Sequence, residues 1–78
     1  MTIKRRPTLI CKTGEEAKEL RGKLGLNQTD FWARLGVTQS GGCRYESGRA
    51  IPKQVILLLH MAYGTDAQAT RMLEWLRE

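Results

Sequence analysis

The sequence has no hydrophobic run long enough to cross a bilayer. Its longest apolar stretch covers residues 55–59 and ends at His60, whereas a membrane-spanning helix needs about 20 predominantly apolar residues. The N-terminus is basic, but almost no apolar segment follows the charges, so it does not have the pattern of a secretory signal. We therefore expect a cytoplasmic protein without a membrane partner, associated with the nucleoid if it binds DNA.

Cysteine and histidine are scarce. The chain has two cysteines, Cys11 and Cys43, and one histidine, His60, and they do not show the close spacing of metal ligands. Isolated cysteines in a non-secreted chain indicate free thiols rather than a disulfide. No serine, cysteine or acid stands in a recognisable catalytic spacing to His60. These absences predict a protein that is not an enzyme and that uses no metal and no cofactor.

Acidic residues are fewer than basic ones. The 78 residues include 13 lysines and arginines against 8 aspartates and glutamates, a net charge of +5, which favours a polyanionic partner. The length suits one small domain. Residues 1–12 form a basic arm, extended or flexible, in which Lys4, Arg5 and Arg6 are not accompanied by an acid. Residues 13–78 form the domain.

Residues 13–78 carry the start and stop signals of five short helices and no convincing strand hairpin. Capping side chains and a first-turn proline mark the helix starts, at Thr13, Asn27, Thr38, Pro52 and Thr65. Glycines mark the helix ends, at Gly25, Gly36, Gly48 and Gly64. The second and third helices are joined by so few residues that a tight helix-turn-helix is predicted at about residues 28–47. The fold class is therefore all-α, a compact five-helix domain.

Around this turn the sequence reads LRGKLGLNQTDFWARLGVTQSGGCRYESGRAIP, from residue 20 to residue 52. The Asn-Gln opening, the glycine in the turn, the aromatic residue of the third helix and the closing ESGR resemble the lambda-repressor-like DNA-binding domains, also called the Cro/CI-type or XRE family. The resemblance implies a sequence-specific regulator that binds double-stranded DNA. It further implies a small dimeric repressor of a bacterial or phage operon, including its own, acting on an inverted-repeat operator.

The resemblance also assigns the DNA contacts. Outward side chains of the third helix would read bases in the major groove: Gln39, Ser40, Cys43 and Arg44. Glutamine can pair bidentately with adenine and arginine with guanine. Flanking residues would bind phosphates: Asn27, Gln28, Thr38, Arg49 and Lys53. The arm residues Lys4, Arg5 and Arg6 would add phosphate or minor-groove contacts.

Two positions depart from the family pattern. Family members usually carry a small residue where Trp32 stands and a branched apolar residue where Gly42 stands, and these positions face each other across the turn. We predict that Trp32 fills the space left by Gly42. The alternative is that the adjacent glycines loosen the helix until DNA binds. By resemblance, Glu46 should form an internal ion pair with Arg21 of the first helix.

The last helix offers an apolar seam for a homodimer, formed by Ala69, Met72, Trp75 and Leu76. The alternative is a monomer in which this helix packs on the body. Two other functions share the observed features. One is an antitoxin-like protein that binds a partner toxin and autoregulates its operon, the partner being unknown. The other is a basic protein that coats nucleic acid or a membrane surface without sequence preference.

Overall fold

The chain folds into five α-helices and no strand within residues 6–78, the part that the computed structural model describes. The helices are α1 (Gly14–Leu24), α2 (Gln28–Ala33), α3 (Gln39–Glu46), α4 (Lys53–Tyr63) and α5 (Asp66–Leu76). The predicted all-α, five-helix fold is confirmed. Within these residues no helix has both the length and the hydropathy that a membrane span requires.

The helix starts follow local capping chemistry. The side-chain oxygens of Thr13, Asn27, Thr38 and Thr65 each accept a hydrogen bond from the backbone N–H three residues on, at 2.8–3.2 Å. Pro52 is the N-cap of α4, one position before the expected first turn. Three of the glycines adopt the left-handed backbone conformation that favours this residue, Gly25, Gly36 and Gly48. Because capping depends on neighbours in the sequence, these boundaries were predictable.

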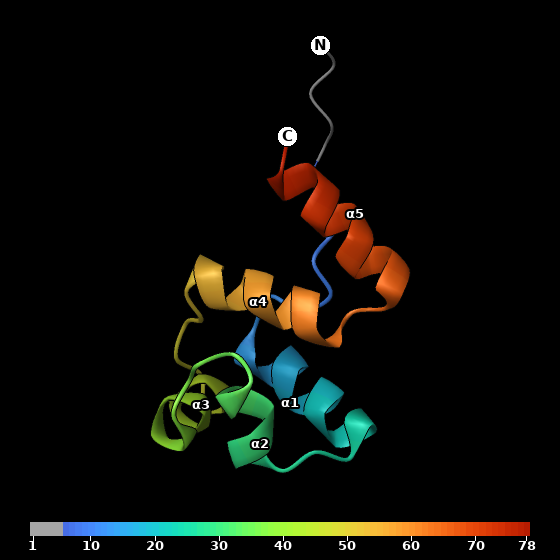
Figure 1. The fold of residues 1–78 in the computed structure, drawn as a ribbon. Helices are drawn as coiled ribbons and strands as arrows, with labels where there is room; N and C mark the ends of the chain where they lie inside the picture. Colours follow the sequence, from blue (N-terminus) through green and yellow to red (C-terminus); the bar gives the residue numbers. More distant parts are fainter. Residues whose placement is uncertain (1–5) are drawn as a thin grey trace.

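Helices α1, α2 and α3 form a cluster at one end of the molecule, and α4 crosses above it (Figure 1). The core includes the fully buried side chains of Phe31, Trp32 and Leu59. The end of α4 is fixed to α2 by Tyr63, whose ring stacks on Phe31 with a centroid distance of 4.4 Å. Its hydroxyl also donates a hydrogen bond to the Phe31 carbonyl oxygen, at 2.6 Å. The position of α4 is therefore set by the first helix of the helix-turn-helix.

Residues 6–12 are not helical but lie on the domain. Cys11 is 5% exposed and belongs to the core; burial raises the pKa of its thiol, and the carboxylates of Glu16 and Glu19 add to that effect. The Ile10 N–H donates to Nδ1 of the buried His60 at 3.2 Å. On the other side of the ring, Nε2 lies 3.3 Å from the Gln68 carbonyl oxygen. The imidazole thus joins the N-terminal segment, α4 and the first turn of α5.

Helix α5 extends away from the other helices, which makes the molecule elongated, with extents of 43 × 22 × 18 Å (Figure 1). Met72 is its buried residue. Leu73 and Leu76 are 44% and 45% exposed. The outer surface of α5 is therefore apolar over part of its length.

Candidate nucleic-acid interface

Helix α3 has an outer face and an inner face. All four residues predicted to read bases are exposed on the outer face: Gln39, Ser40, Cys43 and Arg44. Their positions, 39 and 40 followed by 43 and 44, recur at the spacing of one helical turn. Gly42 is buried, and Tyr45 and Glu46 are half-buried on the inner face. The structure therefore brings the predicted reading residues together on one solvent-facing stripe.

The inner face is placed by the contact between Trp32 and Gly42. Trp32 is fully buried and packs edge-on against Phe31, with ring centroids 5.2 Å apart. A Cβ atom on Gly42 would collide with Cγ and Cδ1 of the Trp32 ring and would lie 2.8 Å from its Nε1. A Cβ on Gly41 would instead meet Val37 Cγ1 at 3.1 Å, a tight but less severe contact. Gly42 is thus the glycine that the packing of α2 on α3 requires.

The carboxylate of Glu46 connects all three helices of this end of the molecule. Arg21 of α1 donates to it twice, from Nε at 3.0 Å and from Nη2 at 2.9 Å. Trp32 of α2 donates from Nε1 at 2.7 Å. The Glu46 side chain is only 4% exposed. A paired carboxylate in this position fixes the orientation of α3 relative to α1 and α2.

Glu46 keeps its charge at neutral pH in spite of its burial. Burial acts to raise the pKa of the carboxyl group. Hydrogen bonds from Arg21, Trp32 and Gln28, together with the positive charge of Arg21, outweigh burial and hold the pKa below its ordinary value of 4.5. The negative charge is therefore neutralised inside the domain and does not face the outer stripe of α3.

Three of the residues predicted to bind phosphates have intramolecular partners. Asn27 caps α2 and also donates from Nδ2 to the Asp30 carboxylate at 3.0 Å. Thr38 is exposed, and its hydroxyl oxygen caps α3. Gln28 is half-buried and hydrogen-bonded to Glu46. These side chains shape the helix-turn-helix, and a DNA phosphate would have to share or displace their present partners.

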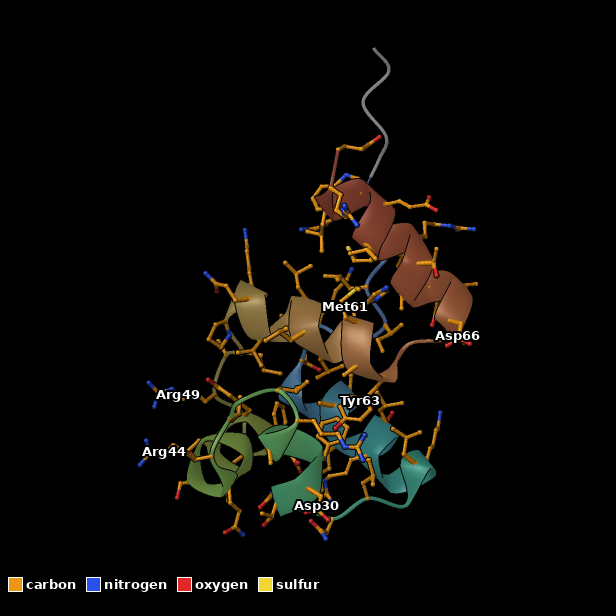
Figure 2. All side chains as sticks on the ribbon, viewed as in Figure 1. Asp30, Arg44, Arg49, Met61, Tyr63 and Asp66 are labelled. Carbon is orange, nitrogen blue, oxygen red and sulfur yellow. The ribbon has the colours of Figure 1, made fainter. Side chains whose placement is uncertain are left out.

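Two exposed arginines lie at the C-terminal end of α3. Arg44 and Arg49 extend outward on the same side of the molecule (Figure 2), and the Arg49 N–H donates to the Arg44 carbonyl oxygen at 3.0 Å. The turn between them contains Gly48 at a φ of 117°. Lys53 follows as the exposed first residue of α4. Arg44 is thus the cation of the outer stripe itself, whereas Arg49 and Lys53 lie outside the stripe.

Of the three arm residues predicted to bind DNA, Arg6 is the one within the described residues. Arg6 is exposed and lines a separate groove with residues of α4 and α5. Lys4 and Arg5 lie outside the described residues.

Sequence reasoning missed one residue that this arrangement needs. A Cβ on Gly14 would collide with the carbonyl group of Tyr45 and would lie 3.2 Å from the Glu46 nitrogen. The first turn of α1 therefore touches the backbone at the end of α3. No local signal indicated this contact, because the capping box of Thr13 and Glu16 does not involve the side chain at position 14.

Comparison with known proteins agrees with this geometry. A family model described as RsaL-like HTH domain matches residues 18–62, more than half of the chain. The match contains α2 and α3 entirely, together with most of α1 and α4. Neither curated proteins nor solved structures give a significant match.

Proposed function

The chain belongs to the family of RsaL-like helix-turn-helix domains, a class of DNA-binding regulator, and on that premise we propose that it is a dimeric, sequence-specific repressor. It would bind an inverted-repeat operator in double-stranded DNA of a bacterial or phage operon, its own included. The observation that carries the proposal is the outer stripe of α3. Its polar and cationic side chains are exposed together, while the opposite face is locked by Trp32, Gly42 and Glu46.

The outer stripe has the chemistry of base recognition. In the major groove, Gln39 can make a bidentate pair with adenine and Arg44 with guanine. Cys43 is small and weakly polar, which suits contact with a thymine methyl group, and Ser40 accepts several bases. Arg49 and Lys53 lie outside the stripe, where they would neutralise phosphates without reading sequence. Lys4, Arg5 and Arg6 would add further sequence-independent contacts.

Substitutions in the two groups should have different effects. Gln39→Ala and Arg44→Ala should each lose discrimination at one base pair in both half-sites, by about 1–3 kcal/mol. Lys53→Ala should weaken binding to specific and random DNA alike. It should also make the dependence of the logarithm of the binding constant on the logarithm of salt concentration less steep, by about one unit. Binding-site selection followed by salt titration measures both effects.

The matched control is Lys23→Ala, which removes an exposed lysine from α1 and should change neither property. If Gln39→Ala and Arg44→Ala select the wild-type site with undiminished preference at every position, α3 is not the reading helix.

The exposed surface of α5 suits a homodimer. A single module of this size buries only about 600–1,000 Å² on DNA, which limits its specificity at physiological salt. Two modules on half-sites about one helical turn apart overcome that limit. Leu73 and Leu76 supply exposed apolar area, whereas the half-buried Trp75 lines a groove with the N-terminal segment and α4 and lies at the edge of this surface. Met72 is fully buried within its own chain, so the interface that we propose uses Leu73 in its place.

Charge on this surface should dissociate the dimer. Leu76→Glu would place a carboxylate in the apolar seam, and we expect sedimentation equilibrium to show a monomer at concentrations where the wild type is dimeric. Affinity for an inverted repeat should fall, while affinity for a single half-site stays the same. Leu24→Glu is the control, because Leu24 has the same 45% exposure but lies on α1. A Leu76→Glu protein that stays dimeric would rule out this seam.

A further inference from the structure

A groove between the N-terminal segment, α4 and α5 has an apolar floor. The floor is formed by half-buried side chains, those of Leu9, Ile56, Leu57 and Trp75. The groove has a volume of about 270 Å³, just under the usual range of small-molecule sites, about 300–1,000 Å³. It is therefore sized for a slender small ligand and is too small for a helix or a folded partner.

The rim of the groove is positively charged. Arg6, Lys12 and Lys53 line it and are exposed, and its lining contains no carboxylate among the described residues. Lys12 lies near Glu16 and helps to lower the pKa of that carboxyl, after the larger effect of backbone hydrogen bonds. Arg6 and Lys53 take part in no ion pair within residues 6–78. Their charges are thus available to an anion above the apolar floor.

An apolar floor under a cationic rim is complementary to an amphipathic anion. We propose that the groove binds a single-chain carboxylate of the medium-chain fatty acid class, with its tail on the floor and its head group between Arg6 and Lys53. Arginine can hold a carboxylate through two parallel hydrogen bonds, and lysine adds a second positive charge. Each methylene that the tail buries should tighten binding roughly fourfold.

Binding of this ligand would oppose binding of DNA. Lys53 lines the groove and is also one of the residues that we propose to bind phosphates, so a carboxylate that engages it competes with a phosphate for the same charge. This consequence rests on the proposed function, whereas ligand binding itself is measured without DNA. The two ideas can therefore fail separately.

The test is calorimetric titration of the full chain with decanoate, below its micelle concentration. We expect saturable binding, about sixteenfold weaker binding of octanoate, which is two methylenes shorter, and no comparable binding of decanol, which lacks the charge. Arg6→Gln should weaken decanoate binding about tenfold or more, since a hydrogen bond to a charged group contributes about that factor to an equilibrium constant. Lys18→Gln removes an exposed lysine of α1 outside the groove and should leave binding unchanged.

A second variant tests the floor. Ile56→Trp fills the groove without removing a cation and should also weaken decanoate binding, with circular dichroism confirming that the variant is folded. In a parallel measurement of DNA binding, decanoate should reduce the DNA affinity of the wild type but not that of Arg6→Gln at the same concentration. Absence of saturable binding, equal binding of decanol, or equal loss in Lys18→Gln would overturn the proposal. Binding that weakens as protein concentration rises would identify a second copy as the occupant and would also overturn it.

Discussion

Replacement of Glu46 by alanine is expected to lower the free energy of unfolding by about 3–5 kcal/mol, the usual cost of removing one partner of a buried ion pair. Arg21 would lose both of its hydrogen bonds to the carboxylate, and Trp32 would keep a buried N–H without an acceptor. Small domains have a total stability of about 5–15 kcal/mol. The variant should therefore be largely unfolded at temperatures that the wild type tolerates.

The same carboxylate should make stability depend on pH. Its pKa in the folded state is below the ordinary value of 4.5, so the unfolded chain binds the proton more readily. The stabilisation is fully present above pH 4.5 and is lost as the pH falls through the folded pKa. Glu46→Gln keeps the shape of the side chain and removes its charge. It should be less stable at neutral pH and should lose less stability on acidification.

Urea denaturation at a series of pH values measures both effects. Glu74→Gln is the control, because Glu74 is an exposed carboxyl of α5. Its removal should leave the loss of unfolding free energy on acidification unchanged. If wild type and Glu46→Gln show the same loss of stability on acidification, Glu46 is not the group that links the fold to pH.

Gly42→Ile is expected to destabilise the domain by roughly 3 kcal/mol or more, although isoleucine is the better helix former. The added side chain would occupy the space of the Trp32 ring. Trp32→Ala alone should cost about 3–5 kcal/mol through the cavity that it leaves. The double variant should be more stable than the sum of these losses predicts, because each change makes room for the other.

Substitutions at two other glycines distinguish the effect of packing on stability from the effect of helix propensity. Gly22 is exposed on α1, and a Cβ there would meet nothing within 4 Å, so Gly22→Ala should stabilise the domain by roughly 0.5–1 kcal/mol. Gly41→Ala should have a small effect of either sign, since only side-chain atoms stand near the new Cβ. Thermal unfolding of the set gives the comparison. A higher melting temperature for Gly42→Ile than for the wild type would contradict the packing argument.

Features that depend on neighbouring residues were predictable from the sequence. The threonine and asparagine caps were placed correctly, because each bonds to a backbone N–H only three residues away. The exchange of sizes between Trp32 and Gly42 suggested their contact, since a tryptophan in a tight turn needs a matching space. The exposure of the outer stripe followed from helical spacing once α3 was located.

Features that depend on how helices meet were not predictable. Gly14 is required only because α1 touches the end of α3. The capping box at the start of α1 does not indicate that contact. Helical periodicity placed Met72 on the apolar side of α5, but the direction of α4 decides which apolar residues are covered and which remain exposed. Cys11 looked like part of an arm and is in the core, since an extended segment carries no periodic signal of the surface that it covers.

The contact between Trp32 and Gly42 also restricts the order in which these positions can change during evolution. A chain with a small residue at position 32 and a branched residue at position 42 would have two routes to the present pair. If tryptophan arrives first, its ring has no space, whereas glycine first leaves a cavity that neighbouring side chains can partly fill. The route in which glycine comes first is therefore the less destabilising one, and a reversal to a small residue at 32 and a branched residue at 42 would have to change Trp32 before Gly42.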